Sequence, residues 1–173
     1  MRKVLAAVVC LALLVLESGA SAHDHEPPRT KLRTGDSRQG GILGSYCWTA
    51  PDGDGGFTGT CVDAIPTWPD ADPGSTGARA RIRFFSRHRP SEIDLSWYER
   101  VDRNGFPVGD THQIDPRLVA VRNDRDRVIA YDARFRLRAT PGHMYINAFG
   151  RWEDRNGAGG MQDASWTFHL RVR

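Results

Sequence analysis

Apolar and polar residues alternate strictly in several short segments of the chain. Residues 79–84 place Ala80, Ile82 and Phe84 on one face and three arginines on the other. The same period of two recurs in residues 93–97, 133–139, 144–148 and 166–172. Successive side chains of a strand point to opposite faces, so this pattern predicts half-buried antiparallel strands. Strands at this spacing predict an all-β protein, an antiparallel β-sandwich of immunoglobulin-like or fibronectin-like type.

Turn residues separate the predicted strands. Two more strands, residues 42–49 and 57–63, flank a loop rich in Gly and Asp, and residues 65–77 are predicted to form a surface loop. No window has a sustained helical period with capping residues. The strongest turn signals are Asn104-Gly105, Asn156-Gly157 and Pro141-Gly142.

The first residues have the pattern of an export signal. Arg2 and Lys3 precede an apolar run at residues 4–16, and Ala20-Ser21-Ala22 is a small-residue cleavage site. The run is too short to span a bilayer as a helix. We expect cleavage after Ala22 and a secreted, extracellular protein with no transmembrane segment in the mature chain. The predicted division is a signal peptide at 1–22, a flexible N-terminal tail at 23–40, and a β-sandwich domain at 41–173.

Two cysteines remain once Cys10 leaves with the signal. Cys47 and Cys61 flank the Gly-rich loop, and a disulfide is the default state of such a pair in a secreted chain. Closing a loop of this size stabilises the folded state by about 3 kcal/mol in the chain-entropy model. The spacing does not fit the short Cys-x-x-Cys frame of redox enzymes.

The segment around these cysteines resembles a known family. Residues 44–48, Gly-Ser-Tyr-Cys-Trp, followed by a second Cys at 61 are similar to small exported proteins and lipoproteins of Gram-positive bacteria. The C-terminal segments 141–145 and 164–168 also fit. The resemblance implies a small β-sandwich and supplies no catalytic residues. A lipoprotein needs a small residue before its lipidated cysteine, and here Val9 precedes Cys10. The resemblance therefore does not imply a membrane anchor in this chain.

The composition is arginine-rich, although the net charge is small. The chain has 24 Lys and Arg against 21 Asp and Glu, and all the basic residues except Lys3 and Lys31 are arginines. We expect no nucleic-acid partner from so mixed a charge.

Two strands present arginines on their polar faces. If these strands are neighbours, their arginines form a candidate site for an anionic cell-wall polymer, an acidic glycan, lipid headgroups or an acidic extracellular protein. The alternative is a solvated face that nearby carboxylates neutralise, namely Glu92, Asp94, Glu99 and Asp132. The candidate residues are Arg79, Arg81, Arg83, Arg134, Arg136 and Arg138.

Other candidate chemistry is weaker. Cleavage after Ala22 would expose His23 and His25 at a free N-terminus, a combination that suits Cu(II) or Ni(II). The acidic turns at residues 52–55 and 123–126 are better interpreted as Asx turns than as calcium loops. Trp68, in the long loop, is a candidate partner contact or else packs over the end of the sandwich.

No catalytic motif or cofactor-binding motif is recognisable in the sequence. The favoured function is therefore a secreted, non-enzymatic β-sandwich that binds an extracellular partner or an anionic ligand. Two alternatives remain open: a protease-inhibitor-like binding domain, and a hydrolase whose site is assembled from scattered His and Asp residues.

Overall fold

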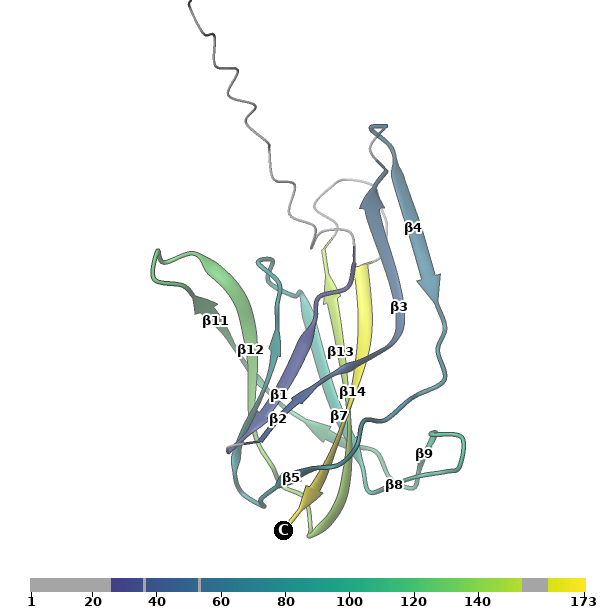
Figure 1. Ribbon diagram of the computed structural model, residues 1–173, viewed down its shortest axis with the longest axis vertical. Coiled ribbons are helices and arrows are strands. Elements are labelled where there is room, and N and C mark those ends of the chain that lie inside the picture. Colours follow the sequence, from purple (N-terminus) through teal and green to yellow (C-terminus); the bar gives the residue numbers. More distant parts are fainter. Residues whose placement is uncertain (1–25, 36, 53, 154–161) are drawn as a thin grey trace, which may run out of the picture.

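The chain folds into two packed β-sheets in a computed structural model that describes residues 26–35, 37–52, 54–153 and 162–173 (Figure 1). The predicted all-β, antiparallel sandwich with one disulfide is confirmed. Among the described residues, no helix has the length and apolar character needed to cross a membrane.

Sheet A has five strands, all antiparallel to their neighbours. Its central strand β6 matches the predicted segment 79–84 in both bounds. The order across the sheet is β11 (Arg117–Arg122), β12 (Val128–Arg136), β6 (Arg79–Phe84), β1 (Thr30–Thr34) and β2 (Ser37–Gly40).

Sheet B is larger and contains five of the predicted strands, whereas the predicted strand 133–139 falls partly in β12 of sheet A, which ends at Arg136. Its order is β10 (His112–Ile114), β7 (Glu92–Tyr98), β13 (Gly142–Trp152), β14 (Gln162–Val172), β3 (Ile42–Pro51) and β4 (Phe57–Val62). The short strand β5 (Asp72–Gly74) lies within the predicted surface loop and pairs in parallel with the end of β14. Strands β8 (Arg100–Val101) and β9 (Pro107–Val108) form a separate hairpin around the predicted Asn104-Gly105 turn.

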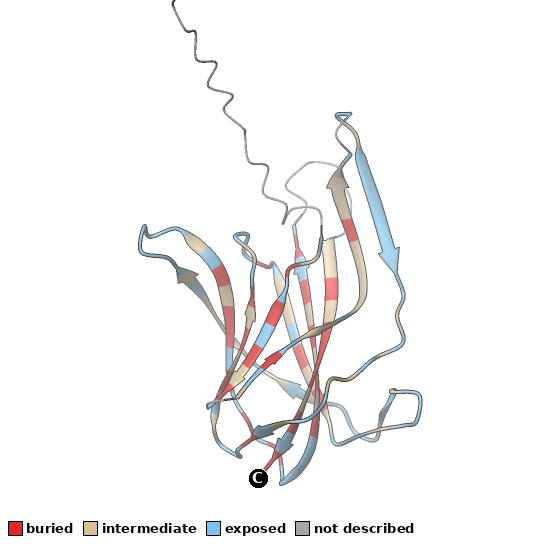
Figure 2. Cartoon of the chain, viewed as in Figure 1, coloured by how far each residue is buried: buried red, intermediate tan, exposed pale blue. Residues whose placement is uncertain are grey.

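The core lies between the sheets, where β6 and β13 bury every second residue and β7, β12 and β14 contribute most of the other buried side chains (Figure 2). Phe84 of sheet A packs edge-to-face on Trp166 of sheet B, with ring centroids 5.5 Å apart. Trp152 makes a similar contact with Trp166 at 6.1 Å. Burying a large apolar side chain stabilises a fold by roughly 1.5–3 kcal/mol, so these rings hold the two layers together.

The predicted flexible tail at residues 23–40 is wrong from Thr30 onwards. Those residues form β1 and β2, and β1 lies inside sheet A, between β6 and β2. The segment has few apolar residues, but it still alternates: Leu32 is only 1% exposed, and Thr30 and Thr34 are buried on the same side. The backbone N–H and C=O groups of β1 form hydrogen bonds with a neighbouring strand on each side. One leucine and two threonines on its inner face are therefore sufficient to keep this segment in the sheet. Residues 23–25, with His23 and His25, lie outside the described residues.

Three hairpin turns use the same device. In each, an Asp or Asn side-chain oxygen accepts hydrogen bonds from the backbone N–H groups two and four residues later. In each, the third residue after it has positive φ. The predicted Asx turns at 52–55 and 123–126 are thereby confirmed. The accepting residues are Asp52, Asp102 and Asn123, and the positive-φ residues are Gly55, Gly105 and Asp126.

The disulfide joins directly opposed residues of one hairpin. Cys47 on β3 pairs with Cys61 on β4, and the β3–β4 hairpin extends beyond the body of the sandwich (Figure 1). All six residues of β4 are exposed. The disulfide therefore fixes a projecting edge of sheet B rather than the core.

Candidate functional site

A continuous row of five arginines crosses the outer face of sheet A. Cross-strand partners lie on the same face of a sheet, and each arginine is the direct partner of the next. Arg33 pairs with both Arg38 and Arg81, and Arg134 pairs with both Arg81 and Arg117. One arginine thus comes from each strand. We call this set the arginine row: Arg38 on β2, Arg33 on β1, Arg81 on β6, Arg134 on β12 and Arg117 on β11.

Further cations flank the arginine row on the same face. On one side, Lys31 opposes Arg83, and Arg83 in turn opposes Asp132. On the other side, Arg79 opposes Arg136. Nine basic residues and one carboxylate therefore share this face within the described strands.

Asp132 is the carboxylate of this face, and its side chain is completely buried. It accepts hydrogen bonds from Nε and Nη2 of Arg83 at 2.7 and 3.1 Å. It also lies 3.8 Å from Arg81 and 3.6 Å from Arg134. The hydrogen bond to Asp132 raises the pKa of Arg83 above its ordinary value. One negative charge is thus shared among three arginines, and no other carboxylate of the described strands lies on this face.

The neighbouring arginines lower the pKa of Arg33 below its ordinary value. The charge of Arg38 lowers the pKa of Arg33 most, followed by desolvation and the charges of Arg81 and Arg83. Like charges directly opposite each other destabilise a sheet. In addition, Nε of Arg81 is buried without a hydrogen-bond acceptor. Both observations describe a surface whose charges and donors are not matched within the chain.

The row borders a broad, open depression of about 1420 Å³, a volume that includes open solvent. Four of the five arginines in the row line it, and so do Arg79 and Arg136. Gly35, in the turn between β1 and β2, lies on the same side and adds no side chain to its wall.

The structure answers the adjacency question that the sequence left open. Strands β6 and β12 are neighbours, and five of the six candidate arginines lie on one face; Arg138 comes after the end of β12 and does not line the depression. Of the carboxylates proposed to neutralise them, Glu92 pairs with Arg151 on sheet B and Asp94 belongs to β7 of that sheet.

Sequence reasoning missed Lys31, Arg33, Arg38 and Arg117. Lys31 and Arg33 carried a usable signal, because they alternate with Thr30, Leu32 and Thr34 just as the arginines of residues 79–84 alternate with their neighbours.

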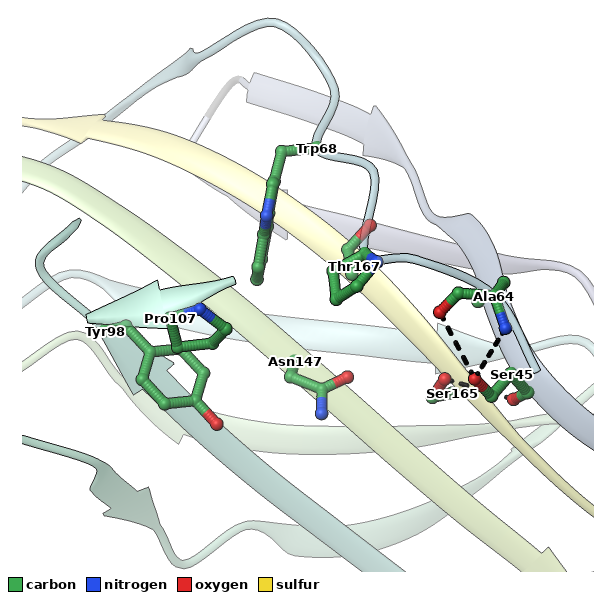
Figure 3. Close-up of a pocket in the computed structure, with 10 residues that line it drawn as sticks. Ser45, Ala64, Trp68, Tyr98, Pro107, Asn147, Ser165 and Thr167 are labelled. Atoms are coloured by element: carbon green, nitrogen blue, oxygen red, sulfur yellow. Dashed lines mark hydrogen bonds between the residues drawn. The ribbon is translucent and has the colours of Figure 1, made fainter. Parts of the chain in front are cut away.

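A smaller hollow of about 510 Å³, solvent included, lies on the outer face of sheet B (Figure 3). Trp68 and Tyr98 form part of its wall, and Asn147 lies on its floor. Trp68 is half-buried: its Nε1 donates a hydrogen bond to the Gly105 carbonyl at 2.8 Å, and its ring packs edge-to-face on Tyr145. The loop tryptophan thus packs against the sandwich, and it also lines a hollow whose side chains carry no charge.

Two histidines meet beside this hollow. Nδ1 of His143 lies 2.8 Å from Nε2 of His169, and Nδ1 of His169 lies 3.1 Å from the Pro69 carbonyl oxygen. Neither ring hydrogen-bonds a serine or a carboxylate in the described part of the chain. Within the same residues, no group of three or more His, Cys, Asp or Glu side chains is arranged to hold a metal ion.

The comparisons with known proteins leave the family open. The predicted resemblance to exported proteins of Gram-positive bacteria stays a prediction. No protein-family profile matches the chain, and no match of significance occurs among curated proteins or solved structures.

Proposed function

We propose that this protein is an exported, non-enzymatic binding module that holds a multiply charged anionic ligand on the arginine row. The observation that carries the proposal is the register of sheet A, which places one arginine from every strand in a single line. Within the described strands of sheet A, Asp132 is the one carboxylate on this face, and it is buried beneath its partners among nine basic residues.

The chemistry of the guanidinium group supports this proposal. Its planar fork of N–H donors binds carboxylate and phosphate oxygens in pairs, and it stays charged at any physiological pH. A row of such groups concentrates anions near the surface. A bound anion also relieves the repulsion among the arginines, so binding and folding reinforce each other.

Export is the second part of the proposal. The basic n-region, the apolar run at residues 4–16 and the small residues before His23 support it, and the disulfide of Cys47 and Cys61 fits an oxidising compartment. The intact mass of the protein recovered from the culture medium tests both features together. We expect the mass of residues 23–173 with the disulfide formed; an uncleaved chain or two free thiols would overturn this part.

The binding proposal is tested with the paired variant Arg81→Gln/Arg134→Gln on a phosphocellulose column. We expect it to elute at clearly lower salt than the wild type, because each lost contact to a phosphate weakens salt-dependent binding. The control is Arg100→Gln/Arg171→Gln, which removes the same charge from exposed positions outside sheet A.

The control variant should elute near the wild type. Equal shifts in both variants would reduce the effect to net charge and overturn the proposed site. Failure of the wild type to bind at low salt would overturn it as well.

A further inference from the structure

We propose that the ligand of the arginine row is a linear chain of phosphate groups that lies across the strands, from β2 to β11. This inference rests on the proposed function and names its ligand class.

The length of the row requires an extended ligand. Neighbouring strands lie about 4.8 Å apart, so a row across five strands spans roughly 19 Å with one cation at each step. A compact anion reaches two or three of these cations. Only a chain with charges repeated along its length contacts Arg38 at one end and Arg117 at the other.

The arrangement of the face sets the direction of the chain. Parallel to the arginine row, Asp132 interrupts the flanking line that contains Lys31 and Arg83. On the other flanking line Arg79 pairs with Arg136, and β1 ends at Thr34 before it reaches a position opposite Arg79. The arginine row is therefore the one line across the described strands of sheet A that is cationic on every strand.

The surroundings of the row suit a chain that continues past both ends. Four arginines of the row line the depression together with Arg79 and Arg136. Strands β2 and β11 are the edges of sheet A. Neither end of the row is therefore covered by a further strand of that sheet, and a polymer longer than the row can enter and leave.

Phosphate fits this spacing better than carboxylate does. A tetrahedral phosphate presents oxygens in several directions, so one group can accept hydrogen bonds from arginines on two neighbouring strands. A planar carboxylate is matched by a single guanidinium fork. Donors are available at the centre of the row, because the partly exposed guanidinium groups of Arg81 and Arg134 lie beyond hydrogen-bond distance of Asp132. Inorganic polyphosphate and a phosphodiester polymer share this chemistry.

The test compares a short and a long phosphate chain on two matched variants. Calorimetry measures the binding of sodium tripolyphosphate and of long-chain polyphosphate to the wild type, to the end variant Arg38→Gln/Arg117→Gln and to the centre variant Arg81→Gln/Arg134→Gln. All four substituted side chains are on the outer face, so the fold is retained, and circular dichroism verifies this. Arg100→Gln/Arg171→Gln is again the charge control.

We expect the long chain to bind the wild type at least tenfold more tightly than tripolyphosphate, because additional linked contacts act at high effective concentration. The end variant should bind tripolyphosphate almost as the wild type does and should lose about tenfold in affinity for the long chain. Each lost phosphate contact should also reduce the slope of log K against log salt by roughly 0.7. The centre variant should weaken the binding of both chains.

Equal affinity for the two chain lengths, with no effect of the end variant, would overturn the linear ligand while leaving an anion site at the centre of the row. No binding of either chain would overturn the proposed function itself. Polyglutamate that binds as tightly as polyphosphate of the same length would overturn the choice of phosphate. Poly(glycerol phosphate), measured in the same way, distinguishes the two sources of phosphate. Tighter binding than polyphosphate identifies a phosphodiester polymer as the ligand, and weaker binding identifies inorganic polyphosphate.

Discussion

The carboxylate of Asp132 lies beneath Arg83 and accepts two hydrogen bonds from its guanidinium group. This pairing fixes one arginine of the face completely and leaves the others only partly compensated. A buried carboxylate is costly unless it is paired, and Asp132 has three cationic neighbours to satisfy it. Asp132 therefore joins the outer face of β6 to that of β12, and it is the one carboxylate on this face within the described strands.

Replacing Asp132 with Asn is expected to destabilise the fold by about 1–3 kcal/mol, because Arg83 loses its charged acceptor and an amide donor then faces its N–H groups. Urea unfolding measures the loss. The matched control is Asp94→Asn on the exposed face of β7, which should change stability by less than about 0.5 kcal/mol. Polyphosphate should recover more stability in the Asp132 variant than in the wild type, since the face then carries no carboxylate. Equal stability of wild type and Asp132→Asn would show that the pair is dispensable.

Stability should fall as the pH drops towards and below 6.5. Desolvation lowers the pKa of His169 below its ordinary value of 6.5, and the charge of His143 acts in the same direction. The hydrogen bond to Pro69 and the charge of Asp70 oppose this shift without cancelling it. The unfolded chain therefore binds a proton before the folded chain does, and the folded state loses stability between 6.5 and the lowered pKa.

Thermal unfolding from pH 7.5 to pH 5 checks this expectation. The variant His169→Asn keeps a donor near the Pro69 carbonyl oxygen and does not titrate, so its midpoint should fall less over the same range. A pH profile identical to that of the wild type would remove His169 as the cause.

The turn between β11 and β12 should be improved by glycine. Asp126 has a φ of 57°. In the other two hairpin turns of the same type, the residue with positive φ is a glycine, Gly55 or Gly105. Asp126→Gly should stabilise the protein by about 0.5–1 kcal/mol, because glycine adopts this conformation without a steric cost. The lost pair with Arg122 is exposed and contributes little. Asp124→Gly in the same turn, at a residue without positive φ, should destabilise instead, and thermal denaturation of the two variants separates these outcomes.

The disulfide should protect one hairpin more than the whole fold. Cys47→Ser/Cys61→Ser should expose the amides of β4 to hydrogen exchange while the amides of β13 and β14 stay protected, because β4 contributes no buried residue. The global loss of stability should stay below the roughly 3 kcal/mol expected for closing a loop of this size. Simultaneous loss of protection in all strands would show that the hairpin and the core unfold as one unit.

Alternation predicts β6, β7, β13, β14 and the second half of β12. In residues 79–84 all three inward side chains are apolar, and the predicted bounds are those of β6. In β1 the inward positions are Thr30, Leu32 and Thr34, and two hydroxyl residues conceal the same period. The sequence pattern of a strand becomes weak when its buried face needs little apolar surface, and for this reason the N-terminal pattern predicts a tail rather than strands.

The sequence predicts on which face of a strand the arginines of the candidate site lie, but it does not predict which arginines of neighbouring strands are opposite each other. The outward direction of Arg81 and Arg134 follows from their apolar neighbours, whereas their direct opposition depends on how β6 and β12 pair. Arg117 belongs to a strand with intermediate burial on both faces, and its place in the row follows only from the sheet order. The buried position of Asp132 is likewise a tertiary property, because its sequence neighbours do not show that three guanidinium groups surround it.

The order of strands in sheet A has a mechanical consequence. Its strands come from three separate stretches of the chain, residues 30–40, 79–84 and 117–136, and interstrand hydrogen bonds join these stretches side by side. The narrow edge strand β2 has only four residues and is the easiest to peel away. A polymer bound along the arginine row would contact all five strands and would cross their backbones at right angles. Tension on such a polymer would be spread across the whole sheet rather than carried by a single edge.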